Sequence, residues 1–318
     1  MDKLMHLVGL HGKSFIPLVM GFGCNVPAIM ASRTIESRSS RLITILINPF
    51  MSCSARLPVF ILLTGTFFPE HAGAMLFMIY MLGCIVAVIT ARLLRRFMFG
   101  PDETPFVMEL PPYRVPTLNA TMRHMWERSE QYLKKMGGLI LVATVIIWFL
   151  SYYPRGGADA TAQMPQTTVT ENVAAMPDTA AEASTQSEQS YLGRIGKFCE
   201  PAMQPLGLDW RASVAMLSGA AAKEIVVSTL GVLYAADDEE EDTSSLSQRL
   251  LASGNYSRAA ALAMMVFILL YFPCIATVAA IAQEAGGWKW AAFSIVYNTV
   301  VAWIIAWIAY HIGMLIGL

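Results

Sequence analysis

The chain has 318 residues, of which 55% are hydrophobic and 14% are charged, and its mean hydropathy is +0.51. Soluble domains usually carry about 25% charged residues, so this composition excludes an ordinary soluble protein and leaves no room for a sizeable soluble enzyme domain. The net charge of −1 excludes a basic nucleic-acid binder, and the five cysteines are not typical of a disulfide scaffold in such a chain.

About seven hydrophobic segments predict an all-α integral membrane protein, because a spanning helix needs roughly 20 apolar residues. The first segment is interrupted by Pro17 and Pro27, so a re-entrant course is the alternative to a full crossing. In chain order the segments are Ser14–Ser32, Leu42–Pro69, Ala72–Ala91, Gly137–Tyr153, Ala212–Ala236, Ala259–Gln283 and Trp290–Tyr310.

Prolines interrupt three of these segments. The second contains Pro49 and Pro58, and the sixth contains Pro273. A proline removes a helical hydrogen bond, and in lipid the freed carbonyl needs a partner in the protein or in a watery cavity. One such proline is as readily a harmless kink, but three interrupted segments in one chain favour a transport pathway.

The chain divides into two similar membrane halves, 1–100 and 210–318. Each contains a small-residue helix, a polar loop and a helix with both proline and cysteine. Between them we expect a cytoplasmic amphipathic linker at 101–136, a transmembrane helix at 137–153, and an external disordered linker with an interfacial segment at 154–209. The arginine-rich loops face the cytoplasm in this arrangement, and the C-terminus is cytoplasmic.

Three cysteines lie within three residues of a proline inside an apolar segment: Cys24, Cys53 and Cys274. Opened helix backbone offers carbonyls and a thiol offers a soft ligand, which suits transition metals better than Mg²⁺. Met51 and Asn25 are candidate additional ligands. The alternative for any one cysteine is a small buried hydrophobe, which we prefer for Cys84. With no CxxC or HxxxH pattern, a weak pathway is favoured over a tight zinc site.

Three ionisable residues interrupt apolar segments: Arg56, Lys223 and Glu224. Such residues are costly in a bilayer and indicate function. Glu224 is a candidate cation ligand, with an ion pair to Arg56 as the alternative. Arg56 and Lys223 are candidates for gating or for purely structural charge pairing. The run Leu10–Ser14 lacks the first glycine of a phosphate-binding loop, so no GTP site is expected in this chain.

Several motifs in this order closely resemble the membrane domain of FeoB-type ferrous iron transporters, across nearly the whole chain. They are GFGCNVPA at 21–28, RTIE at 33–36, LINPFMSCSARLP at 46–58, AKEIVV at 222–227 and FPCIAT at 272–277.

This resemblance implies two Gate repeats and Fe²⁺ import across a bacterial inner membrane, with Cys24, Cys53 and Cys274 lining the iron path. The chain corresponds to the C-terminal membrane portion of such transporters and lacks their N-terminal GTP-binding domain. We therefore expect no enzymatic activity here. The implied partners are a GTP-binding domain in cis or in trans, small cytoplasmic Feo accessory proteins, the lipid bilayer and possible further copies of the chain. Nucleic acid is not expected as a partner.

The residues leave two other functional interpretations open. A polar cavity with Asn25, Asn48 and Glu224 would suit a nucleoside or another polar solute, as in other Gate-type carriers. A truncated, non-transporting membrane scaffold is the third possibility.

Overall fold

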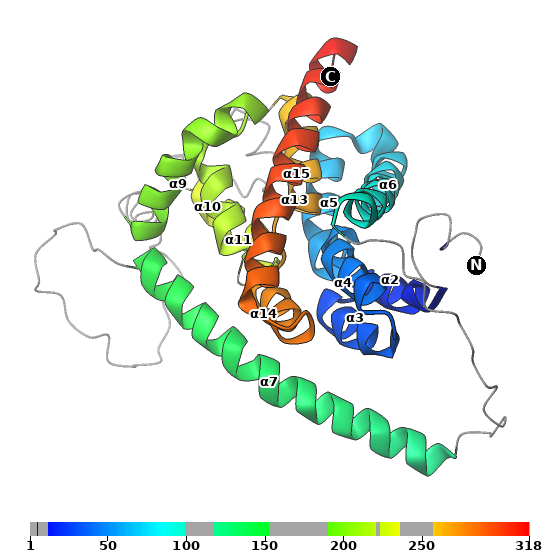
Figure 1. The fold of residues 1–318 in the computed structure, drawn as a ribbon. Helices are drawn as coiled ribbons and strands as arrows, with labels where there is room; N and C mark the ends of the chain where they lie inside the picture. The colour runs from blue at the N-terminus through cyan, green and yellow to red at the C-terminus, as the bar shows by residue number, and fades with distance from the viewer. Residues whose placement is uncertain are drawn as a thin grey trace, which may run out of the picture. The chain divides into compact units, whose positions relative to one another are not determined.

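A computed structural model describes residues 5, 12–98, 117–152, 190–220, 223–235 and 257–317. These residues are helical with no β-strand, so the all-α prediction is confirmed (Figure 1). Four stretches are long and apolar enough to cross a membrane, as expected of an integral membrane protein. The count of seven segments is not confirmed. The four stretches are Arg38–Phe67, Pro69–Phe97, Arg258–Glu284 and Trp288–Ile316.

The helices alternate between short broken pieces and long continuous ones. Short 3₁₀ turns join several of them: η1 (Gly12–Ser14), η2 (Ser32–Thr34), η3 (Asn48–Phe50), η4 (Ser54–Arg56), η5 (Pro69–His71) and η6 (Gln204–Leu206). The α-helices are α2 (Phe15–Gly21), α3 (Asn25–Ala31), α4 (Arg38–Ile47), α5 (Leu57–Phe67), α6 (Ala72–Phe97), α7 (Leu118–Tyr152), α9 (Tyr191–Met203), α10 (Trp210–Ser218), α11 (Ile225–Ala235), α13 (Arg258–Leu270), α14 (Ile275–Glu284) and α15 (Trp288–Ile316).

The order of elements repeats along the chain. In the first half, a helix pair (α2, α3) precedes a broken helix (α4, α5) and a long helix, α6. In the second half, the pair α10 and α11 precedes the broken helix α13–α14 and the long helix α15. The first and fifth predicted segments are each built from two short helices, and neither is among the four long stretches.

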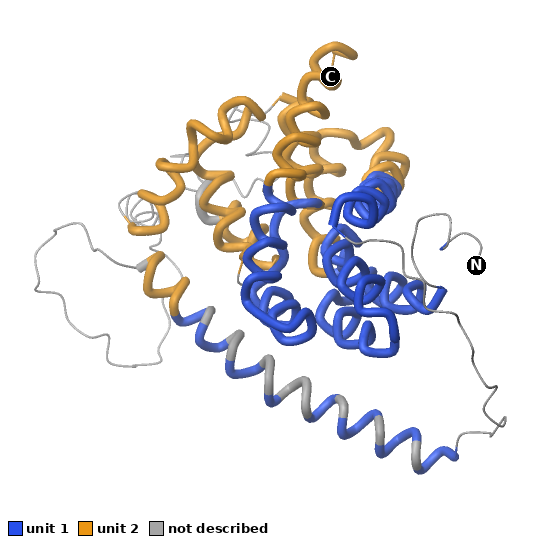
Figure 2. Tube along the Cα trace, in the orientation of Figure 1, with its two compact units in different colours: residues 1–54, 80–145, 270–299 blue, residues 55–79, 146–269, 300–318 orange. Residues whose placement is uncertain are grey.

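The chain folds into two compact units (Figure 2). Unit 1 comprises residues 1–54, 80–145 and 270–299, and unit 2 comprises residues 55–79, 146–269 and 300–318. The chain passes from one unit to the other at residues 54/55 and 269/270, at or beside the two broken long helices, and at 79/80, 145/146 and 299/300, within α6, α7 and α15. Each unit therefore contains parts of both sequence halves.

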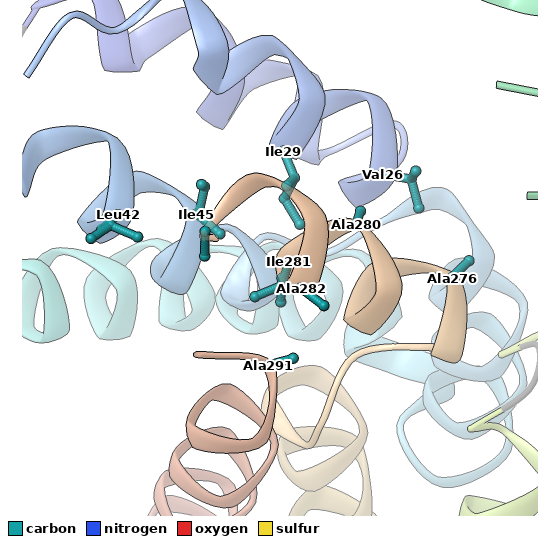
Figure 3. Packing of buried hydrophobic residues seen from close by; sticks show 10 residues of the cluster. Val26, Ile29, Leu42, Ile45, Ala276, Ala280, Ile281, Ala282 and Ala291 are labelled. Carbon is teal, nitrogen blue, oxygen red and sulfur yellow. The ribbon is translucent and has the colours of Figure 1, made fainter. Parts of the chain in front are cut away.

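The core of unit 1 joins helices from both ends of the chain. Apolar residues of α3 and α4 pack against small residues of α14 and the first turn of α15 (Figure 3). Alanine dominates the α14 side, which lets the helix backbones approach closely, as is typical of packing inside membranes. The cluster is Val26, Ile29, Leu42, Ile45, Ala276, Ala280, Ile281, Ala282, Ala285 and Ala291.

Close helix contacts through glycine hold unit 2 together. A Cβ atom on Gly196 of α9 would lie 2.4 Å from Val214 Cγ2 of α10, so only glycine permits this packing. Gly313 of α15 similarly lies against Ala259 of α13. The indole of Trp303 donates to the Ala202 carbonyl at 2.7 Å, which fixes the end of α9 to α15.

Some predicted segments differ from the structure or fall outside the described residues. α7 continues without a break through residues 136 and 137, where the sequence suggested a change from linker to transmembrane helix. Its paired glycines, Gly137 and Gly138, do not interrupt it, and the space beside each Cα is open. Residues 101–116 and 153–189, which contain most of the two predicted linkers, lie outside the described residues.

Candidate functional site

Every predicted site residue lies in, or directly beside, one of four helix breaks. Three of these breaks each contain one of the three cysteines, and the remaining break contains Lys223 and Glu224. Break 1 covers residues 22–24 between α2 and α3, and break 2 covers 48–56 between α4 and α5. Break 3 lies between α10 and α11 and is described at residues 219, 220, 223 and 224. Break 4 covers 271–274 between α13 and α14.

Break 1 follows directly from its sequence. Pro27 has no N–H to donate, so a continuous helix would leave the Gly23 carbonyl, four residues earlier, without its usual partner. Ser54 of break 2 supplies that partner. Its backbone N–H donates to the Gly23 oxygen at 3.2 Å and its hydroxyl donates at 3.0 Å. The freed carbonyl thus joins the two breaks, and the neighbouring residues Cys24 and Cys53 belong to joined segments.

A glycine allows a second close approach between these breaks. A Cβ atom on Gly21 would lie 2.6 Å from Asn48 Oδ1 and 3.1 Å from Met51 Cβ. Asn48 is fully buried, and its amide nitrogen donates to the Pro17 carbonyl of α2 at 3.3 Å. The end of α2 therefore rests directly on break 2, and the buried Met51 thioether lies beside this contact.

The three predicted cysteines all belong to unit 1. Cys24 is exposed and directly precedes α3, whereas Cys53 and Cys274 are half-buried. Cys274 directly precedes α14, packs against the unit 1 core, and its sulfur lies 3.1 Å from the Thr277 hydroxyl. Within the described parts of the chain, no three His, Cys, Asp or Glu side chains are grouped to hold one metal ion.

The first residue of α3 and two residues of break 2 have buried oxygen atoms that accept no hydrogen bond from the described residues. They are Asn25 Oδ1, Asn48 Oδ1 and Ser52 Oγ. An unsatisfied buried acceptor costs about 1–3 kcal/mol, so each invites a donor or a cation. Sequence reasoning missed Ser52, whose only signal was its place beside Cys53. Neutral oxygens and thiol sulfurs are both ligand types that borderline divalent metal ions accept.

The charged candidates belong to unit 2. Arg56 is fully buried and Lys223 is 4% exposed, and each makes at least one interaction with the rest of the protein. Glu224 is exposed in the turn before α11. Over the part of the chain that the structure describes, no ion pair joins Glu224 to Arg56.

An ion pair that sequence reasoning missed lies at the edge of unit 1. Arg33 of η2 donates two hydrogen bonds to Glu284 at the end of α14, one of them at 2.7 Å from Nε to Oε2. This hydrogen bonding raises the pKa of Arg33 above its ordinary value. The two residues are 251 positions apart, so no local pattern could reveal the pair.

Unit 2 also contains a polar hollow of about 360 Å³ on its surface, between the end of α9 and the start of α10. Asp209 caps α10 there by accepting from the Ala212 N–H at 2.9 Å. The indole of Trp210 has Lys197 Nζ and the Arg211 guanidinium each 5.6 Å from its ring. None of the predicted site residues lines this hollow.

Comparison with known proteins defines the class. The family Gate, described as nucleoside recognition, matches residues 1–67 and 133–288, and the chain belongs to this family. The family described as the C terminus of ferrous iron transport protein B matches residues 76–128. No solved structure matches the chain.

Individual related proteins identify the chain more specifically than the family models do. The chain is 53% identical to a fusion of Fe(2+) transport protein A with Fe(2+) transporter FeoB from Porphyromonas gingivalis, covering 99% of this chain and 39% of that protein. It is 41% identical to the Fe(2+) transporter FeoB of Campylobacter jejuni, covering 99% of this chain and 49% of that protein. Its identity to the FeoB of Methanocaldococcus jannaschii is also 41%. The predicted resemblance to FeoB-type transporters is confirmed, and the chain spans half or less of the length of these relatives.

Proposed function

We propose that this protein forms the ion-conducting membrane part of a ferrous iron transporter in a bacterial inner membrane. The observation that carries the proposal is the match to Fe(2+) transporters over 99% of the chain. That match includes all four breaks, where the thiols and the unsatisfied oxygens lie. Fe²⁺ is the cargo, and it enters from the external side.

The residues of breaks 1, 2 and 4 provide successive weak contacts for the ion. Fe²⁺ exchanges part of its water shell for the oxygen atoms of Asn25, Asn48 and Ser52 and passes the sulfur atoms of the three cysteines and Met51. A transported ion must also leave, so scattered ligands serve better than one closed cage. Glu224, exposed at break 3, adds a negative charge that attracts the cation.

The buried cations have a different role in this proposal. Arg56 and Lys223 hold the backbone of breaks 2 and 3 in place and oppose a second positive ion in the pathway. Replacing either by a neutral residue of similar length would alter the rate of opening rather than the affinity for Fe²⁺.

Gating and energy supply come from elsewhere in the transporter. We place GTP hydrolysis in a GTP-binding domain, joined in cis or bound in trans, and no enzymatic step in this chain. The P. gingivalis relative is fused to Fe(2+) transport protein A, which supports a small accessory protein of that kind as a cytoplasmic partner. The C-terminus is cytoplasmic in this arrangement, and further copies of the chain could assemble around it.

The test is uptake of radioactive Fe²⁺ by cells that express the transporter from its natural gene. Cys24→Ser, Cys53→Ser and Cys274→Ser, alone and combined, should each reduce uptake while the protein still reaches the membrane. Cys84→Ser is the matched control, because Cys84 lies in the unbroken helix α6. Wild-type uptake by the triple variant would contradict the cysteine pathway.

The alternative cargo is a polar organic solute. The description of the Gate family as nucleoside recognition favours it, as do the buried amides of Asn25 and Asn48. Competition between nucleosides and Fe²⁺ for uptake would support this alternative. A complete lack of flux for either substrate, with the GTP-binding partner present, would instead support a non-transporting scaffold.

A further inference from the structure

One face of α15 places polar residues inside the membrane-spanning region. In its most apolar window only 17% of residues are buried, so most of this helix faces outward. Ala291, Ser294 and Asn298 are nevertheless fully buried. Their spacing of three and four residues puts them on one side of the helix. A buried asparagine in the middle of a spanning helix is costly and requires an explanation.

A hydrogen bond to a neighbouring helix does not explain the burial of Asn298. Polar residues in membranes often bond across to a neighbouring helix. The Asn298 amide nitrogen instead donates to Ser294 Oγ, one turn earlier in the same helix, at 3.0 Å. Its amide oxygen is buried and accepts nothing from the described residues. Among the described residues, Asn298 therefore makes no side-chain hydrogen bond to another helix, and its amide oxygen stays open.

The neighbouring Tyr297 shares this property. Its hydroxyl oxygen is also buried and without a hydrogen-bond partner among the described residues. Its ring is held firmly, stacked on Phe293 at 5.7 Å and in edge contact with Phe50 at 5.7 Å between ring centroids. A fixed ring with an open hydroxyl is positioned to bind a ligand that the described residues do not provide.

Phe50 connects these residues to break 2. It is the last residue of η3, which begins at Asn48. Asn48 Oδ1 and Ser52 Oγ lie on either side of Phe50 in the sequence. Both oxygens are also buried and have no hydrogen-bond partner among the described residues. Unit 1 thus has open neutral oxygens on both the broken helix and the continuous helix that packs against it.

We propose that Asn298 Oδ1 and Tyr297 Oη are two separate oxygen contacts for the transported divalent cation, beyond the cysteines. The inference rests on the proposed function and adds a determinant of metal selectivity to it. Neutral amide and hydroxyl oxygens suit hard and borderline ions such as Mn²⁺ and Fe²⁺, whereas thiols alone favour softer metals. Uncharged ligands also bind weakly enough to release the ion.

The sharpest test is Tyr297→Phe, measured in the transporter expressed from its natural gene. This change keeps the ring and both aromatic contacts and removes only the open hydroxyl. A purely structural role predicts unchanged or higher stability with unchanged transport, because a buried unpaired group is lost. Our proposal predicts the same stability result but a KM for Fe²⁺ raised about tenfold, the effect of about 1.4 kcal/mol of binding.

A second test is Asn298→Leu, with Thr299→Val in the same helix as its control. Asn298→Leu should raise the KM for Fe²⁺ and Mn²⁺ more than that for Zn²⁺. The Thr299 hydroxyl donates to the Ile295 carbonyl of its own helix at 2.7 Å, so Thr299→Val leaves the Asn298 amide and its bond to Ser294 unchanged and should keep the wild-type KM. Wild-type KM values in both Tyr297→Phe and Asn298→Leu, with the cysteine variants impaired, would overturn this inference alone. Absence of Fe²⁺ uptake by the wild type would overturn the proposed function and this inference with it.

Discussion

Gly21→Ala should destabilise the contact between α2 and break 2. The added methyl would lie 2.6 Å from Asn48 Oδ1 and 3.1 Å from Met51 Cβ, so one of them must move. Asn48 is fully buried and already donates to the Pro17 carbonyl, so its side chain cannot turn away without weakening that bond. Overpacking of this kind costs about 1–3 kcal/mol.

Thermal unfolding of the purified protein measures this effect. At about 2–4 °C for each kcal/mol, Gly21→Ala should lower the melting temperature by several degrees. Gly65→Ala in α5 is the matched control, because no atom lies within 4 Å of its added methyl and alanine is the better helix former. A melting temperature for Gly21→Ala at or above that of the wild type would refute the reasoning, as would an equal loss in the control.

Three further predictions concern the stability that is provided by contacts within a single unit. Arg33→Gln should destabilise more than Glu284→Gln, because it leaves a carboxylate that is only 8% exposed without its partner; equal losses in chemical unfolding would contradict this. Gly196→Ala should lower the melting temperature, and Val214→Ala in the same chain should restore part of the loss by removing the atom that clashes. Ser54→Ala removes one of two hydrogen bonds to the Gly23 carbonyl and should lower the free energy of unfolding by about 0.5–1.5 kcal/mol. An unchanged free energy of unfolding would show that other contacts hold the break.

The sequence predicts the breaks well because their cause is local. Proline removes a backbone donor wherever it occurs, so Pro27, Pro49 and Pro273 mark helix interruptions that the structure also has. The helical class follows from composition in the same way. The three predicted cysteines are therefore found at the breaks, since they were selected for lying near those prolines. Lys223 and Glu224 were selected for their charge, and they lie at break 3, whose sequence has no proline.

What the sequence does not predict depends on contacts between distant residues. The Arg33–Glu284 pair and the bond from Ser54 to Gly23 need the fold to bring their partners together. Tyr297 and Asn298 lie in an uninterrupted apolar segment, and their open oxygens are visible only once burial and hydrogen bonds are known. The division of each broken helix between two units likewise has no local signal.

The most direct measurement is the rate at which a thiol reagent modifies each cysteine of the wild-type protein in lipid. The rates are compared with and without Fe²⁺, and oxygen is excluded throughout. Mass spectrometry reports all five cysteines together, so Cys84 and Cys199 are internal controls. We expect Fe²⁺, and not Mg²⁺, to slow modification of Cys24, Cys53 and Cys274 and to leave the two controls unchanged. Equal rates at all five cysteines with and without Fe²⁺ would contradict an iron path along the helix breaks.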